Sequence, residues 1–228
     1  MVEEGKISTG SELFDRFLGG GYEKGVLTTL YGPGGSGKTN LCLLALIRMT
    51  GTGKKVIYID TESSFSVERL RQITRYADQV LARTVFFRPP SFEEQHEVIR
   101  QLPKLVRRGV GLVVVDTIAM LYRLALGEAR SVQPVNTMLA KQLAILIRLA
   151  RVNDLPVLVA NQVYADFQDK EKMKIVGGDI LRNGSRCLIE LQAFAAGRRR
   201  AMLRKHRSLK EGAVDFVITQ KGIASPER

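Results

Sequence analysis

The chain has 228 residues, of which 45% are hydrophobic, and 35 lysines and arginines stand against 23 aspartates and glutamates. This length suits one well-buried core, so we expect a single domain over residues 1–228. The net charge of +12 favours a polyanionic partner such as nucleic acid, although a ribosomal or membrane-surface protein would look similar. The N-terminus is acidic, no apolar run is long enough to span a bilayer, and Cys42 and Cys187 match no metal-ligand spacing. We therefore expect a soluble cytoplasmic protein with no membrane contact.

The middle of the chain alternates short β-branched runs with longer segments of helical spacing. Near-continuous apolar runs predict buried parallel strands at 26–31, 56–59, 112–115 and 155–160. Between the last two, apolar residues recur at helical spacing and predict a helix over 138–149. This alternation implies right-handed crossovers and a mostly parallel, doubly wound α/β domain.

After Gly184 the pattern changes to shorter strands joined by tight turns. The predicted strands cover 186–194, 200–205 and 214–219, with the first turn at Gly197. We expect these C-terminal strands to extend the same sheet in antiparallel fashion.

A glycine-rich segment lies between the first predicted strand and a helix. It matches the P-loop pattern G-x-x-x-x-G-K-[ST] through Gly32, Pro33, Gly34, Gly35, Ser36, Gly37, Lys38 and Thr39, with Asn40 opening the helix. Glycines let backbone N–H groups surround phosphate oxygens, and the helix N-terminus favours negative charge. We expect Lys38 to bridge the β- and γ-phosphates and the Thr39 hydroxyl to bind Mg²⁺. The segment thus predicts a site for ATP and Mg²⁺.

Asp116 ends the apolar run 111–115 and is therefore expected at the carboxyl edge of the sheet. There it would hold the Mg²⁺ shell, as the Walker B aspartate does. The alternative is a helix-capping aspartate at a strand end.

Asp60 and Glu62 follow the strand at 56–59, near the predicted phosphate site. Glu62 is the candidate general base that would orient and deprotonate the water attacking the γ-phosphate. In the alternative interpretation, one of these carboxylates caps the helix that begins at 66–69.

Gln162 follows the strand at 155–160, again at the catalytic edge. A neutral amide can bond phosphate or water without changing charge, which suits a γ-phosphate sensor. A solvent-exposed turn amide is the alternative.

Together these segments resemble the RecA/RadA recombinase family along nearly the whole chain. The landmarks are residues 7–10, 18–21, 32–39, 58–62, 66–70, 116–123, 161–163 and 176–180. The resemblance implies a RecA-type ATPase core, in which Glu62 is the catalytic glutamate, Gln162 the γ-phosphate sensor and Arg69 the arginine near the adenine.

The resemblance also implies two DNA-binding segments, one after Asp116 and one after Gln162. Arg123 and Arg130 fall in the first segment. The second contains Lys170, Lys172 and Lys174.

The chain most resembles the short archaeal branch of that family, RadB. RadA recombinases carry an N-terminal helix-hairpin-helix domain and a Phe-x-x-Ala linker, whereas the landmarks here begin by Ile7. We therefore expect a weakly hydrolysing ATPase that binds DNA and assists the main RadA recombinase instead of forming its own strand-exchange filament. A Holliday junction resolvase and a second copy of this chain are the other expected partners.

The stretch 198–210 is the most basic of the chain and contains no acidic residue. Lys205 and Arg207 resemble a basic strand-end element that reaches a neighbouring subunit's γ-phosphate in KaiC-like relatives. A basic edge strand that resists aggregation is the alternative. Two other functions also remain open, an ATP-switched protein-interaction module and a KaiC-like signalling ATPase.

Overall fold

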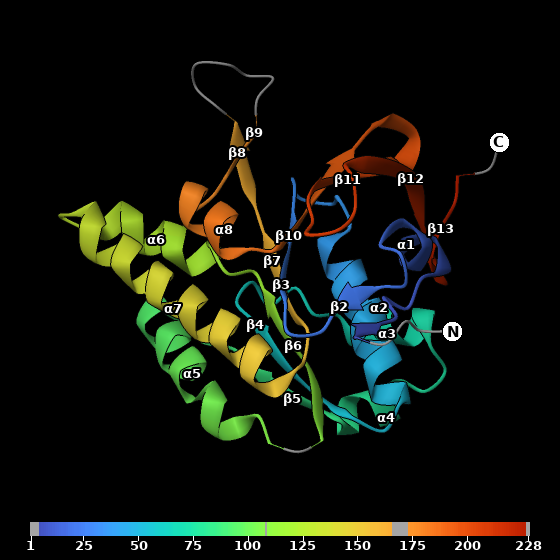
Figure 1. Cartoon of the computed structure of the whole chain (residues 1–228), viewed down its shortest axis with the longest axis horizontal. Coiled ribbons are helices and arrows are strands. Elements are labelled where there is room, and N and C mark those ends of the chain that lie inside the picture. Colours follow the sequence, from blue (N-terminus) through green and yellow to red (C-terminus); the bar gives the residue numbers. More distant parts are fainter. Residues whose placement is uncertain (1–4, 108, 166–172, 227–228) are drawn as a thin grey trace.

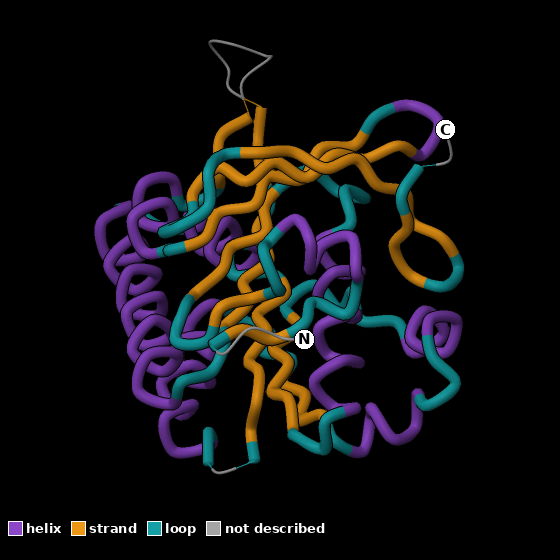
Figure 2. The backbone as a smooth tube through the Cα atoms, turned by 45° about the vertical axis from the view of Figure 1, so that its right-hand side comes forward, coloured by secondary structure: helices purple, strands orange, loops and turns teal. Residues whose placement is uncertain are grey.

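A central sheet with helices on both faces organises the protein (Figures 1 and 2). The structure is a computed structural model that describes residues 5–107, 109–165 and 173–226. Within these residues the main sheet has nine strands in the order β13-β12-β11-β10-β3-β7-β6-β4-β5, and β1-β2 and β8-β9 form two small two-stranded antiparallel sheets.

The elements have the following bounds. The strands are β1 (Lys6–Ile7), β2 (Tyr22–Glu23), β3 (Leu27–Tyr31), β4 (Lys55–Asp60), β5 (Thr84–Phe87), β6 (Val110–Asp116), β7 (Val157–Asn161), β8 (Val163–Ala165), β9 (Met173–Ile175), β10 (Cys187–Ala193), β11 (Arg198–Lys205), β12 (Gly212–Thr219) and β13 (Gly222–Ala224). The helices are α1 (Glu12–Phe17), α2 (Lys38–Gly51), α3 (Val67–Ile73), α4 (Ala77–Ala82), α5 (Phe92–Leu105), α6 (Met120–Glu128), α7 (Val132–Asn153) and α8 (Gly178–Gly184).

Alternate residues of the central strands enter two hydrophobic cores, one on each face of the sheet. Val114 and Leu158 pack with α1, α2, α3 and α4, whereas Val113 and Val157 pack with α5, α6, α7 and α8. All four are fully buried, and burying one such side chain stabilises a fold by about 1.5–3 kcal/mol. Burial on both faces explains why these strands read as continuous apolar runs.

The direction of the sheet changes after β10. β10, β3, β7, β6, β4 and β5 run in parallel, and β11, β12 and β13 add on in antiparallel fashion. The expected fold class is confirmed, but the predicted strand 186–194 pairs in parallel with β3. Helix α8 precedes β10 and provides room for a crossover, whereas the short turn after β10 allows only an antiparallel return.

The parallel strands bring distant polar residues to one edge of the sheet. Tyr31 pairs with Asn161, and Asp116 pairs with both Asp60 and Ala160. Ligands of open α/β sheets bind at such carboxyl ends. No described helix is long and apolar enough to cross a membrane.

Candidate nucleotide-binding site

The loop between β3 and α2 is the predicted P-loop, and two of its glycines occupy positions that disfavour a larger residue. A Cβ atom on Gly32 would lie 2.1 Å from the carbonyl oxygen of Leu191 on β10, so a larger residue does not fit there. Gly37 caps α2 with a φ of 107°, in the left-handed region that favours glycine. The loop is therefore shaped by β10 on one side and by the start of α2 on the other.

Lys38 lies inside this loop and is 7% exposed. Its Nζ donates to the carbonyl oxygens of Gly32 at 2.9 Å and Pro33 at 2.8 Å. Burial lowers the pKa of Lys38, while the nearby carboxylates of Asp116 and Glu62 act in the opposite direction. The Oγ of Ser36 is buried beside it and has no partner among the described residues. These groups leave hydrogen-bonding capacity for an anion.

Asp116, at the end of β6, is 1% exposed. Its Oδ2 accepts hydrogen bonds from Thr39 Oγ1 and Tyr58 OH, both at 2.8 Å, whereas its Oδ1 is buried and has no partner within the described ranges. Burial raises the pKa of Asp116, and the two hydrogen bonds partly offset that rise. A buried carboxylate oxygen without a partner, beside a hydroxyl, fits the oxygen donors that Mg²⁺ prefers.

Glu62 and Gln162 meet although they are 100 residues apart. Glu62 Oε1 accepts from Thr117 Oγ1 at 2.7 Å and from Gln162 Nε2 at 2.7 Å. Thr117 follows Asp116, so the three residues come from the carboxyl ends of β4, β6 and β7. The geometry brings the predicted base and the predicted sensor into direct contact.

The amide of Gln162 also reaches the predicted DNA-binding region. Arg123 on α6 lies with its Nη1 3.4 Å from Gln162 Oε1, and its side chain is exposed. Glu62, Gln162 and Arg123 therefore form one continuous polar chain from the strand edge to α6.

Asp60 is also buried at this edge, but its carboxylate is used locally. It accepts from the backbone N–H of Ser64 at 3.0 Å and of Phe65 at 3.3 Å. Helix α3 is capped instead by Ser66, whose side chain accepts from Arg69 N. Asp60 thus stabilises the segment that carries Glu62, and neither carboxylate caps α3.

Arg69 lies beside the start of α2. Its Nε donates to Asn40 Oδ1 at 2.9 Å, and its Nη2 donates to the Thr219 carbonyl oxygen at 2.7 Å. The arginine therefore ties the first turn of α2 to the end of β12. The structure places three residues of the predicted site, Asn40, Arg69 and Lys38, around one helix N-terminus.

The structure adds residues that the sequence patterns did not indicate. Arg199 on β11 donates through Nε to the Gly35 carbonyl oxygen at 2.9 Å, at the tip of the P-loop. Tyr58 and Thr117 hold Asp116 and Glu62, as described above. Tyr58 and Thr117 adjoin recognised motifs and could have been found there. In contrast, no sequence pattern in residues 198–200 indicates a contact with the P-loop.

The two predicted DNA-binding segments contain regular structure. The first forms α6, and exposed Arg130 follows it; the second includes the β8-β9 hairpin. Lys170 and Lys172 lie outside the described residues. Lys174 pairs with Tyr164 in that hairpin, and its side chain is likewise outside the description.

Lys205 and Arg207 have partners within the chain. Lys205 Nζ donates to the Arg182 carbonyl oxygen at 2.8 Å, and Arg207 Nε donates to Glu23 Oε1 at 3.0 Å. Between them the His206 side chain is 2% exposed and its Nδ1 accepts from the N–H of Leu209. The histidine is structural, and the action of Lys205 and Arg207 on a neighbouring subunit stays a prediction.

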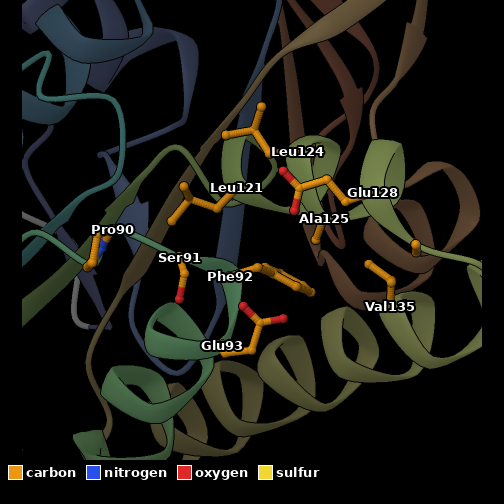
Figure 3. Close-up of a pocket in the computed structure, with 10 residues that line it drawn as sticks. Pro90, Ser91, Phe92, Glu93, Leu121, Leu124, Ala125, Glu128 and Val135 are labelled. Atoms are coloured by element: carbon orange, nitrogen blue, oxygen red, sulfur yellow. The ribbon is translucent and has the colours of Figure 1, made fainter.

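A separate pocket of about 360 Å³ lies between the start of α5, α6 and the start of α7 (Figure 3). It is lined by Pro90, Ser91, Phe92, Glu93, Leu121, Leu124, Ala125, Glu128, Ala129 and Val135. None of these residues belongs to the predicted ATP site.

The fold, with its P-loop between β3 and α2, defines a RecA-type α/β protein. The model of the Rad51 family matches residues 3–226, so the chain belongs to that family. It is 39% identical over 92% of its length to the DNA repair and recombination protein RadB of Methanococcoides burtonii, covering 93% of that protein. It is 41% identical to RadB of Methanoculleus marisnigri, covering 96% of this chain and 97% of that protein. A crystal structure of the RadB recombinase superposes with a TM-score of 0.82 at 37% identity, over 97% of this chain and 100% of the other.

Proposed function

We propose that this protein binds Mg-ATP, hydrolyses it slowly, and binds DNA as an accessory protein of homologous recombination in the cytoplasm. The observation that carries the proposal is the convergence of Lys38, Thr39, Asp116, Glu62 and Gln162 at one edge of the sheet. Its RadB relatives are DNA repair and recombination proteins, which supports the proposed DNA binding.

The P-loop, from Gly32 to Thr39, would bind the triphosphate through its backbone N–H groups after Pro33, because Pro33 has none and the N–H of Gly32 donates to Asn161. Lys38 would exchange its two carbonyl partners for phosphate oxygens, and Asn40 and Arg69 would lie on the side of the nucleoside. Thr39 and the free Oδ1 of Asp116 would hold Mg²⁺, which supplies positive charge against the phosphates when bound.

Glu62 would act as the general base for the attacking water, and Gln162 would orient that water or the γ-phosphate. Glu62 Oε1 already accepts two hydrogen bonds, from Thr117 and Gln162. Both contacts would have to rearrange before this oxygen could accept the proton of the attacking water. We therefore expect slow turnover from the isolated protein.

The polar contact between Gln162 and Arg123 favours a second candidate, in which ATP acts mainly as a switch. A γ-phosphate that attracts Gln162 would release Arg123 on α6, a segment proposed to contact DNA or a protein partner. RadA is the proposed main partner, with a Holliday junction resolvase or a second copy as others. Lys205 and Arg207 would reach the nucleotide of such a copy after leaving Arg182 and Glu23.

Measuring ATP turnover with and without single-stranded DNA separates the two candidates. We expect slow turnover that changes on DNA addition and is abolished by Lys38→Ala in a folded protein. Tight ATP binding with no turnover under either condition would favour the switch, and retained ATP affinity in Lys38→Ala would contradict the proposed site.

A further inference from the structure

The amino ends of the parallel strands form the edge of the sheet opposite the candidate nucleotide site. Cations precede or open four of these strands, with Lys24 before β3, Lys54 and Lys55 at β4, Arg83 before β5 and Arg107 before β6. This edge lies towards the bottom of Figure 1, near α4 and the end of α5, whereas α2 begins in the upper half of the molecule.

Part of this edge forms a basic pocket of about 230 Å³. Lys24, Arg48 and Lys54 line it together with Lys6, Ile7, Ser8, Met49 and Thr52. No carboxylate is among the lining residues, and no ion pair within residues 5–107, 109–165 and 173–226 engages Lys24, Arg48 or Lys54. Arg48 and Lys54 are exposed and Lys24 is half-buried, so all three can meet a ligand.

Contacts within the fold position two cations of this edge, Lys54 and Arg83. The stem of Lys54 packs against Gly111, where an added Cβ would lie 2.7 Å from Lys54 Cδ. Arg83 Nη1 donates to the Gly53 carbonyl oxygen at 2.9 Å. These contacts connect the segments before β4, β5 and β6 into one surface.

Helix dipoles and one carboxylate act against anion binding there. The carboxyl ends of α2, α4, α5 and α7 lie at this edge, because a parallel strand starts after each of them, and each end carries a partial charge of about −0.5. Asp154 precedes β7 and adds one carboxylate. Six cations stand against these roughly three negative charges, so the edge keeps a positive excess; they are Lys24, Arg48, Lys54, Lys55, Arg83 and Arg107.

We propose that this amino edge is a second contact surface for the phosphate backbone of nucleic acid, on the side of the sheet away from the proposed ATP site. The inference rests on the proposed DNA binding and adds a place for a second strand. The order β3-β7-β6-β4-β5 contains four strand spacings of about 4.8 Å, or about 19 Å of edge. At the duplex rise of about 3.4 Å per phosphate of one strand, that length accommodates at most about five or six phosphates, and fewer when the strand is extended. Contacts from lysine and arginine to phosphates position a strand without reading its bases.

The first test compares two charge-matched double variants, each lacking one lysine and one arginine. Arg48→Gln with Lys54→Gln removes charge from the amino edge, and Lys141→Gln with Arg148→Gln removes it from exposed positions on α7. Glutamine keeps much of the side-chain stem and the helix propensity. If both edge residues contact phosphate, the log–log salt dependence of single-strand affinity flattens by about 1.4 in the edge variant only. The melting temperatures of the edge variant and wild type are compared as well, because a purely helix-stabilising role of Arg48 would lower the melting temperature without changing the salt dependence.

The second test asks whether one protein preparation holds two strands. An immobilised oligonucleotide is saturated with protein, and capture of a second, fluorescent oligonucleotide is measured. The edge variant should stay on the immobilised strand and capture several-fold less of the second, whereas the α7 variant should match wild type. Equal slope and equal capture in the edge variant and wild type would overturn the inference. A second result would also overturn it. If wild type binds phosphatidylserine vesicles, and the edge variant loses that binding but keeps the DNA affinity of wild type, the edge is a membrane-contacting surface.

Failure of the proposed function has a different signature. If wild type does not bind the immobilised strand even at low salt, the proposed DNA binding fails and the inference that rests on it fails as well. If wild type binds and the edge variant is indistinguishable from it, the inference fails while the proposed function stands.

Discussion

Asp116 is buried where an ionised carboxylate is unfavourable in the absence of a cation. Thr39 and Tyr58 satisfy one of its oxygens, and the other has no partner among the described residues. Because burial raises the folded-state pKa of Asp116, its stabilising contribution is present when it is protonated at low pH. That contribution is lost as the pH rises through the folded-state pKa, so the ionised side chain costs stability.

We expect Asp116→Asn to raise the melting temperature of the nucleotide-free protein at pH 7. A gain of about 1 kcal/mol corresponds to about 2–4 °C for a chain of this size. The variant should also lose the additional stabilisation that Mg²⁺ gives to the ATP complex. Thermal unfolding with ATP, with and without Mg²⁺, measures both effects, and a lower melting temperature without nucleotide would contradict the account of burial.

Glu62→Gln should keep nucleotide affinity and lose turnover by about 100-fold or more, because the amide cannot accept the proton of water. The amide oxygen can still accept from Thr117 and Gln162, so the local hydrogen bonds are retained. Nucleotide titration and phosphate release are the measurements. Equal turnover in variant and wild type would reduce Glu62 to a positioning role for Gln162.

At the scale of elements, β10 packs closely against the P-loop. Gly32 lies against the backbone of Leu191, whereas a Cβ on exposed Gly34 would meet no atom within 4 Å. The two glycines therefore offer a matched pair of substitutions in the same loop.

Gly32→Ala should destabilise the protein by about 1–3 kcal/mol or more, because the loop or β10 must shift to admit the methyl group. Gly34→Ala should leave the free energy of unfolding nearly unchanged. Denaturant unfolding of both variants checks this. Equal stability of the two would mean that the contact between the P-loop and β10 can relax without cost.

The sequence predicted those elements whose residues carry a local pattern. Strands β3, β4, β6 and β7 are mostly apolar and buried, and the site residues at their ends follow from the parallel order. The pairing of β10 with β3 was not predicted, because an apolar strand does not show the direction of its neighbour. The contact of Arg199 with Gly35 depends on that pairing and on the return of β11, so no local signal could reveal it.

At the scale of the whole molecule, the net charge is +12, and exposed cations lie at both edges of the sheet. Arg123 and Arg130 lie exposed at or after α6, and the basic pocket lies at the opposite, amino edge. Phosphate contacts at either edge release condensed counterions, so DNA affinity should fall steeply with salt.

Arg123→Gln with Arg130→Gln should weaken binding of all single-stranded sequences alike and flatten the log–log salt slope by about 1.4 if both contact phosphate. Fluorescence anisotropy at several salt concentrations measures the slope, with the α7 double variant as the control. An unchanged slope would remove α6 from the DNA-binding surface.

The close contact of Gly32 with Leu191 also bears on the order in which the chain matures on the ribosome. Residues 32–39 emerge early, but the strand that forms one wall of their loop emerges more than 150 residues later. Pairings between such distant segments form slowly because a long loop must close first. A nascent chain that ends before β10 should therefore not retain ATP, although its whole phosphate-binding motif has already been translated.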